Sequence, residues 1–143
     1  MRAVVQRVSE ATVMVDGRSV AAIEQGLLVY LGVAAVDDDT DLKYVVDKVR
    51  HLRIFSDENE RINLDVAQAR GKVLVVSAFT VQADARHGRR PSFQGAAPPD
   101  RARAVVAGGA ASATAVRVAD ALCDPRGCIC LADGQAPARC VIR

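Results

Sequence analysis

The most informative segment near the start of the chain is Leu27-Leu28-Val29-Tyr30-Leu31-Gly32-Val33, a continuous apolar run. A short run of this kind between turn signals is typical of a buried strand. A second run of the same character, Lys72-Val73-Leu74-Val75-Val76-Ser77, begins directly after Gly71. The two runs predict two buried strands, the first of them central in a sheet.

Outward from this centre, β-branched residues predict further strands at residues 2–8 and 11–15. Asp16-Gly17 is a hairpin signal, so residues 18–24 are expected to form the return strand. The acidic residues 37–41 precede apolar residues at helical spacing and predict a helix near residues 40–52. A solvated helix start explains this acidic run better than a metal site does, because no partner ligands lie nearby in the sequence.

The chain of 143 residues suits one domain that buries its own core. We expect an α+β fold with a curved, mostly antiparallel sheet that closes toward a barrel and carries packed helices. Pro98-Pro99-Asp100 predicts the start of a second helix, which Gly108-Gly109 should interrupt. Residues 105–143 form an atypical region that is rich in Ala, Arg and Cys.

Composition limits the possible partners. The net charge of +2, with 25% charged residues, is that of an ordinary soluble protein, so an RNA site would need local clustering of Arg. Neither a signal peptide nor a membrane span is visible, which predicts a cytoplasmic protein without a membrane partner. The spacing of Cys123, Cys128, Cys130 and Cys140 fits no common zinc pattern, and free thiols, no metal and no cofactor are expected.

Two segments are candidates for function. The first is Ser77-Ala78-Phe79-Thr80, at the end of the second buried strand. Its hydroxyls and aromatic ring could frame a small polar substrate. Composition alone favours the alternative, in which Ser77 and Thr80 cap a turn and Phe79 belongs to the core.

The second candidate is Arg86-His87-Gly88-Arg89-Arg90-Pro91-Ser92-Phe93. Arg89 and Arg90 suit phosphate because a guanidinium donates two hydrogen bonds at once. A solvated basic loop is an equally good interpretation. His87 is a poor general base here, since neighbouring positive charge disfavours its protonated form. A Ser-His-Asp set is not recognisable.

Several ordered segments carry a family resemblance: Met1-Arg2-Ala3-Val4-Val5-Gln6-Arg7-Val8-Ser9-Glu10-Ala11, Gly26 to Val33, Leu52-Arg53-Ile54-Phe55-Ser56-Asp57, and Val75-Val76-Ser77-Ala78-Phe79-Thr80-Val81-Gln82-Ala83-Asp84 with Gly88-Arg89-Arg90-Pro91-Ser92-Phe93. Over about residues 1–104 the chain resembles the D-aminoacyl-tRNA deacylases. The resemblance implies hydrolysis of the ester of D-aminoacyl-tRNA, and of glycine mischarged on tRNA-Ala, as a chiral proofreading step in translation.

The resemblance also implies a homodimer whose active sites are shared between subunits. It further implies that the 2′-hydroxyl of the bound tRNA assists the attacking water. By family motif, Ser77, Phe79 and Thr80 are the expected catalytic residues. Arg7, Gly134, Arg89 and Arg90 are the expected substrate-binding residues.

The chain departs from the family pattern at two places. Ala78 stands where the first motif, Ser-Gln-Phe-Thr, has Gln. The second motif, Asn-x-Gly-Pro-Val-Thr with a cis Gly-Pro bond, has its nearest counterpart in Ala132-Asp133-Gly134-Gln135-Ala136-Pro137. Gln135 removes the proline that makes a cis bond accessible. Divergence or decay explains this region, and so does a reading-frame error. The alternative function is an impaired member that binds tRNA without efficient hydrolysis.

Overall fold

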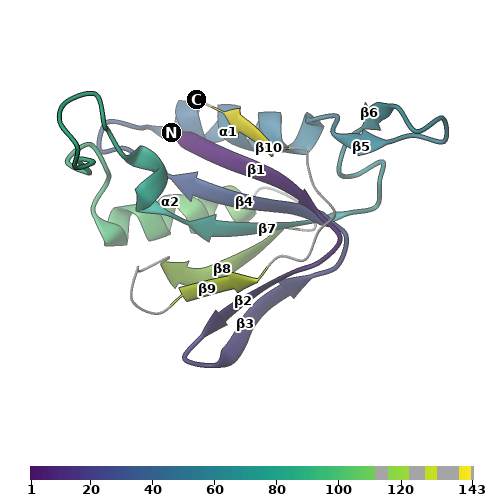
Figure 1. Ribbon diagram of the computed structural model, residues 1–143, viewed down its shortest axis with the longest axis horizontal. Coiled ribbons are helices and arrows are strands. Elements are labelled where there is room, and N and C mark those ends of the chain that lie inside the picture. Colours follow the sequence, from purple (N-terminus) through teal and green to yellow (C-terminus); the bar gives the residue numbers. More distant parts are fainter. Residues whose placement is uncertain (112–115, 123–127, 132–138, 143) are drawn as a thin grey trace.

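The computed structural model describes residues 1–111, 116–122, 128–131 and 139–142 (Figure 1). The elements follow in the order β1 (Arg2–Val8), β2 (Ala11–Val15), β3 (Arg18–Ile23), β4 (Gly26–Gly32), α1 (Asp39–His51), β5 (Phe55–Ser56), β6 (Ile62–Leu64), β7 (Lys72–Ser77), the short 3-10 helix η1 (Phe79–Gln82), α2 (Pro99–Ala111), β8 (Val116–Leu122), β9 (Cys128–Leu131) and β10 (Arg139–Ile142).

The main sheet has the strand order β10-β1-β4-β7-β8, so both apolar runs lie at its centre. Every residue of β4 is buried except Tyr30, which is half-buried. β4 runs antiparallel to β1 and parallel to β7, with Gly26 opposite Lys72 and Leu31 opposite Ser77. The prediction of a central buried strand is confirmed. The parallel orientation explains why this strand is apolar on both faces.

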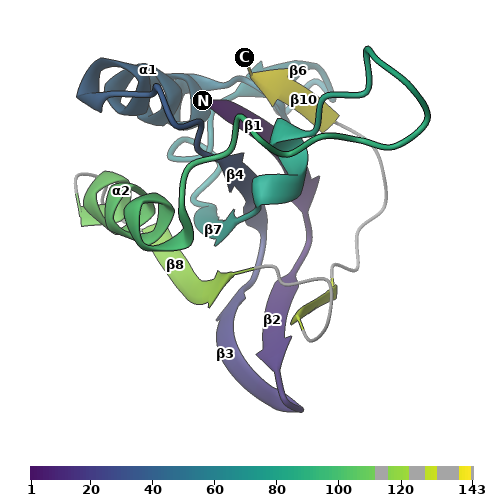
Figure 2. The same cartoon turned by 90° about the vertical axis from the view of Figure 1, so that its left-hand side faces the viewer.

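A second sheet with the order β3-β2-β9 packs beneath the first (Figure 2). Asp16 and Gly17 join β2 to β3 with positive φ angles of 50° and 75°, as the hairpin signal predicts. Five strand pairs in the described residues are antiparallel and two are parallel. The predicted α+β class with a mostly antiparallel sheet is confirmed. The described strands pair as separate sheets and not around one closed ring.

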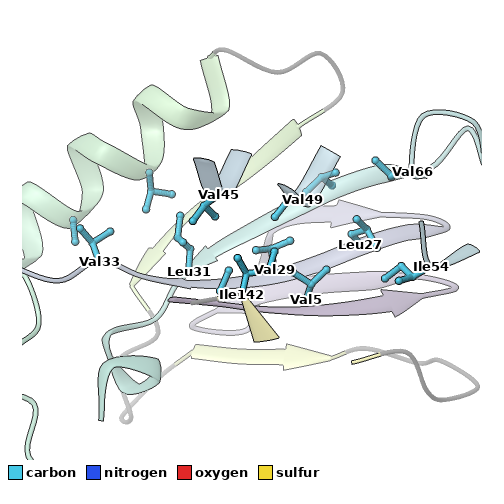
Figure 3. Packing of buried hydrophobic residues seen from close by; sticks show 14 of the residues in the cluster. Val5, Leu27, Val29, Leu31, Val33, Val45, Val49, Ile54, Val66 and Ile142 are labelled. Atoms are coloured by element: carbon cyan, nitrogen blue, oxygen red, sulfur yellow. The ribbon is translucent and has the colours of Figure 1, made fainter. Parts of the chain in front are cut away.

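The main sheet separates two apolar clusters because side chains alternate between its faces. On one face, α1 and α2 cover residues such as Leu27, Val29 and Leu31, and Figure 3 shows Val45 and Val49 of α1 pointing at this row. The opposite face is covered by the second sheet, whose hairpin packs on the alternate residues of β4 and β7. Both clusters consist mainly of aliphatic side chains, as expected for a chain with 3% aromatic residues.

The acidic run starts α1, as predicted. The Asp38 side chain accepts hydrogen bonds from the backbone of Thr40 (2.8 Å) and Asp41 (3.2 Å), while the Asp41 carboxylate accepts from the Asp38 backbone. This is a capping box. The backbone N–H groups of Asp41 and Thr40 lower the pKa of Asp38, because they stabilise its ionised form.

Asp37, next to this cap, is buried and joins several elements. Its carboxylate lies 2.6 Å from the α-amino group of Met1 and 2.6 Å from the backbone nitrogen of Ala34. Its carbonyl accepts a hydrogen bond of 2.6 Å from Arg101 in α2. These contacts tie the start of β1 to the segment between β4 and α1, and to α2.

The prediction that Gly108-Gly109 interrupts the second helix is wrong, because α2 continues to Ala111. Gly109 lies against α1, where an added Cβ would stand 2.8 Å from Cδ1 of Leu42. A glycine costs about 1 kcal/mol in a helix relative to Ala. The close approach of the two helices, which sequence alone does not show, offsets this cost.

Gly26 offers a direct test of the β4–β7 pairing, since a Cβ there would lie 1.8 Å from the backbone oxygen of Lys72. We expect Gly26→Ala to lower the free energy of unfolding by about 3 kcal/mol, the upper part of the range for overpacking. Gly95→Ala is the matched control, because nothing lies within 4 Å of a Cβ there; its effect should stay within about 0.5 kcal/mol. Urea unfolding measures both, and equal stabilities would contradict the described pairing.

Candidate functional site

The first candidate segment begins where β7 ends. The backbone nitrogen of Ala78 donates to the Leu31 carbonyl at 2.9 Å, which extends the parallel pairing one residue beyond Ser77. The chain then turns into η1. Ser77 is buried, Phe79 is half-buried and Thr80 is exposed. The exposure of the three predicted catalytic residues therefore increases along the chain, from the core at Ser77 to the surface at Thr80.

The turn-capping interpretation of the two hydroxyls is not what the structure shows. The residue that caps η1 is Ala78, and no side chain caps it. Among the described residues, the hydroxyls of Ser77 and Thr80 have no hydrogen-bond partner. The exposed Thr80 hydroxyl thus remains available to a ligand or to water, whereas Ser77 is largely buried.

Gln82 anchors η1 to the sheet. Its buried amide nitrogen donates to the Gly32 carbonyl at the end of β4, at 2.6 Å. Gly32 itself allows a close approach, since a Cβ there would lie 2.3 Å from Cγ2 of Val81. Arg2 at the start of β1 adds longer hydrogen bonds to the carbonyls of Val81 (3.4 Å) and Ala83 (3.3 Å). Three strand ends therefore hold η1 in place.

Sequence reasoning gave no role to Gln82 or Arg2. Both lie inside segments that resemble the family, but their function depends on contacts with residues that are distant in the chain. A polar residue five positions after the end of β7 was the only local signal for Gln82. Both are positioning residues here, because they act on the backbone that carries Thr80.

The Arg-rich segment forms a loop closed at its base by two backbone hydrogen bonds. Asp84 and Ser92 exchange N–H to O bonds of 2.9 and 2.8 Å. Inside the loop, Gly88 has a positive φ of 77°. The Asp84 carboxylate also binds Arg86 at 2.6 Å, and this charge-assisted hydrogen bonding lowers the pKa of Asp84 well below its usual range.

Because Arg86 is paired with Asp84, Arg89 and Arg90 are the cations of the loop that remain available to a ligand. Both side chains are exposed, and neither forms an ion pair with any residue that the structure describes. Arg86, in contrast, is largely neutralised by its partner. The predicted patch of three arginines is thus reduced to the two that sequence analysis assigned to phosphate.

Two phenylalanine rings connect the loop to the strand end. Phe79 and Phe93 meet edge to face, with ring centroids 5.2 Å apart and planes at 73°. Such a pair is a favourable aromatic geometry. The structure therefore brings together the Ser77–Thr80 edge and the loop that carries Arg89 and Arg90. We call this combination the strand-end site.

Arg7 is not part of the strand-end site within one chain. It pairs with Leu27, which lies beside Val73, four residues before Ser77. At about 3.3 Å per residue, Arg7 and Ser77 are about 13 Å apart in the strand direction, and β4 lies between their strands. Arg7 donates to the Ile54 carbonyl at 2.9 Å and lines a separate hollow of about 630 Å³.

Other predicted features cannot be placed. Gly134 and residues 132–137, the counterpart of the second family motif, lie outside the described residues, as do the side chains of the four cysteines. Within the described ranges, no three His, Cys, Asp or Glu side chains cluster as a metal site requires. None of the helices described is long and apolar enough to cross a membrane.

The strand-end site offers hydroxyls and cations, and no base is hydrogen-bonded to these hydroxyls among the residues that the structure describes. A Ser or Thr hydroxyl is a weak nucleophile unless an adjacent base activates it. In the described part of the chain, His51 contacts Asp47, and neither histidine is hydrogen-bonded to Ser77 or Thr80. This chemistry suits binding and orienting a polar substrate beside a phosphate, and it leaves activation of water to another group.

Comparison with known proteins identifies the family. Residues 4–120 match the family model described as D-Tyr-tRNA(Tyr) deacylase. The D-aminoacyl-tRNA deacylase of Thermotoga petrophila is 54% identical over 105 residues, which cover 73% of this chain and 70% of the relative. That of Koribacter versatilis is 54% identical over 103 residues, covering 72% and 69% of the two chains.

Solved structures agree on the fold. A c-Myc DNA unwinding element binding protein superposes with a TM-score of 0.88 at 27% identity, covering 100% of this chain and 98% of that one. A probable eukaryotic D-amino acid tRNA deacylase gives a TM-score of 0.69 at 14% identity, covering 99% and 98%. The family resemblance predicted from the sequence is confirmed: the chain belongs to the D-Tyr-tRNA(Tyr) deacylase family and is a hydrolase of this kind.

Proposed function

We propose that this protein hydrolyses the ester that joins a D-amino acid to the terminal adenosine of tRNA, releasing the free amino acid and tRNA. Glycine mischarged on tRNA-Ala is a second substrate in this proposal. The observation that carries it is the strand-end site, where the Phe79–Phe93 contact joins the edge bearing the Ser77 and Thr80 hydroxyls to the loop that carries Arg89 and Arg90, neither of which has an ion pair among the described residues. Such a step is a chiral proofreading reaction of translation and belongs in the cytoplasm.

The aminoacyl group occupies the edge formed by Ser77, Phe79 and Thr80. Thr80 is exposed and is the second residue of η1, which follows β7 directly, so its hydroxyl and backbone can orient the substrate. Water attacks the ester carbonyl carbon, and the bond from that carbon to the ribose oxygen breaks. Since no base from the described part of the chain contacts these hydroxyls, assistance from the tRNA 2′-hydroxyl fits the site better than a protein nucleophile does.

Arg89 and Arg90 hold the tRNA backbone in this proposal. Both guanidinium groups are exposed and have no acidic partner among the described residues, so they can bind phosphate oxygens. The Asp84–Arg86 pair shapes the loop that presents them. Arg7 lies about 13 Å from Ser77 in the strand direction, so its predicted substrate contact involves another part of the tRNA or the partner subunit.

A homodimer with shared active sites is part of the proposal, with Gly134 supplied by the partner subunit. The sequence also favours a second candidate, a member that binds tRNA without efficient hydrolysis. Ala78 replaces the Gln of the first motif, and Gln135 replaces the proline after Gly134. A cis bond without proline costs about 2.5–4 kcal/mol, so Gly134-Gln135 is not expected to adopt the cis geometry of the family's Gly-Pro pair.

Deacylation of D-Tyr-tRNA and L-Tyr-tRNA, assayed side by side, tests the proposal. We expect slow hydrolysis of D-Tyr-tRNA and poor discrimination against L-Tyr-tRNA, because the sequence lacks the Gly-Pro pair of the second family motif. Thr80→Val should lower kcat/KM for D-Tyr-tRNA about tenfold, the effect of one lost hydrogen bond. Thr12→Val in β2 is the control for the loss of a hydroxyl.

Two outcomes would change the account. Hydrolysis no faster than the spontaneous reaction, with tRNA binding retained, would favour the non-hydrolytic member. A rate comparable to an intact family member that also spares L-Tyr-tRNA would place selectivity around Ser77, Phe79 and Thr80 instead of in the second motif.

Charge reversal in the loop tests the phosphate contacts separately. Arg89→Glu combined with Arg90→Glu should weaken tRNA binding and reduce the slope of log K against log salt by about 2, roughly one unit per phosphate contact. Filter binding across a salt series measures this slope. The control is Arg18→Glu with Arg61→Glu, since both side chains are exposed elsewhere and the net charge is the same.

Asp84→Asn tests whether tRNA binding depends on the shape of the loop or only on the net charge of the protein. The substitution raises the net charge by one, so simple attraction predicts tighter tRNA binding. If the Asp84–Arg86 pair shapes the loop, binding should instead weaken or stay the same. Tighter binding, or a control pair as damaging as the loop pair, would show that the loop has no specific role.

A further inference from the structure

A cavity of about 450 Å³ lies between α1, α2 and the face of β4 and β7. This volume falls in the range of about 300–1,000 Å³ that is typical of small-molecule sites. Protein interiors are normally packed without voids of this size. None of Ser77, Phe79 or Thr80 lines it, so it is separate from the strand-end site.

The cavity walls are aliphatic. They are formed by Val29 and Leu31 of β4, Val73 and Val75 of β7, Leu42, Val45, Val46 and Val49 of α1, Val106 and Gly109 of α2, and the connecting residues Val66 and Ala67. Among its described side chains, α2 contributes a valine and a glycine to this wall, and these small residues leave space beneath the helix. Such side chains favour a hydrocarbon ligand, because they offer it no hydrogen-bonding group.

Three cations line the cavity together with this aliphatic surface. Arg50 lies in the last turn of α1, and Arg70 and Lys72 flank Gly71 at the start of β7. Figure 3 shows that Val49, beside Arg50 in sequence, lies near Val66, whereas Val45 lies toward Leu31 and Val33. Val66 also contacts Gly71, since a Cβ on Gly71 would lie 3.1 Å from its Cγ2. The cations therefore gather at one end.

The opposite end of the cavity is apolar. Leu42 and Gly109 meet there, and Leu42 precedes Arg50 by eight residues, or about 12 Å along the helix. At the cationic end, Lys72 lies 3.3 Å from Glu24, while Arg50 and Arg70 are exposed and have no ion pair with any described residue. The cavity thus combines an elongated hydrocarbon wall with two unpaired guanidinium groups at one end.

We infer that this cavity binds a medium-chain fatty acid, with the alkyl chain toward Leu42 and Gly109 and the carboxylate toward Arg50 and Arg70. Burial of the chain supplies affinity, since apolar surface leaves water. The two guanidinium groups supply selectivity for an anionic head group, because a guanidinium binds a carboxylate through paired hydrogen bonds. A cation of the same chain length would meet repulsion at the same end.

Isothermal titration calorimetry on the full chain tests this inference. Decanoate, decanol and decyltrimethylammonium are compared below their micellar concentrations. Decanoate should bind about tenfold more tightly than decanol, the effect of about 1.4 kcal/mol from the charged contacts. Decyltrimethylammonium should bind most weakly.

Two sets of variants locate the site. Val46→Phe fills the cavity from α1 and should abolish binding of all three ligands, whereas Val20→Phe on the exposed face of β3 should leave binding unchanged. Arg50→Gln with Arg70→Asn leaves the interior intact; Asn suits position 70 because its φ is 54°. This pair should weaken decanoate about tenfold without affecting decanol. Arg18→Gln with Arg61→Gln is its charge-matched control.

Three results would overturn the inference: no binding of decanoate, equal binding of decanoate and decanol, or decanoate binding that neither variant set alters. If Val46→Phe does not fold, as judged by circular dichroism and urea unfolding, the arginine pair decides alone. The measurement needs no tRNA, so its outcome is independent of the deacylation assay.

Discussion

The parallel pairing of β4 with β7 depends on how closely two backbones approach at Gly26 and Lys72, where no side chain fits. From this point the strands stay in register to Leu31 and Ser77, and Ala78 adds one more hydrogen bond to the Leu31 carbonyl. Each face of this pair carries one apolar cluster, with the helices on one side and the second sheet on the other. Both layers of the fold are therefore organised around two adjacent strands.

The same pairing positions the strand-end site. β7 delivers Ser77 and η1 to the end of β4, where Gln82 binds the Gly32 carbonyl and fixes the backbone that carries Thr80. The contact between Phe79 and Phe93 then brings the Arg-rich loop to this edge. Substrate orientation in the proposed reaction thus rests on backbone geometry and not on an acid-base set. This suits a site whose hydroxyls contact no base among the described residues.

Local patterns in the sequence predicted much of the fold. The apolar runs, the Asp16-Gly17 turn and the acidic start of α1 each have a local physical cause, and each is confirmed. Other features of the fold and of the site depend on tertiary contacts. The parallel orientation of β7, the passage of α2 through Gly109, the neutralisation of Arg86 by Asp84 and the anchoring role of Gln82 all need partners that spacing does not specify. Arg7 was grouped with the site by family resemblance alone, and its distance from Ser77 follows from strand register.

The central claim is that the Gln82 amide holds η1 and the adjoining loop on the end of β4. Hydrogen exchange by mass spectrometry, comparing the natural chain with Gln82→Met, tests it most directly. Met keeps the length of the side chain but leaves the Gly32 carbonyl without its partner. Exchange in residues 78–93 should accelerate about tenfold, while β1, β4 and β7 keep their protection. Unchanged exchange in residues 78–93, or an equal loss of protection across the whole sheet, would contradict the account.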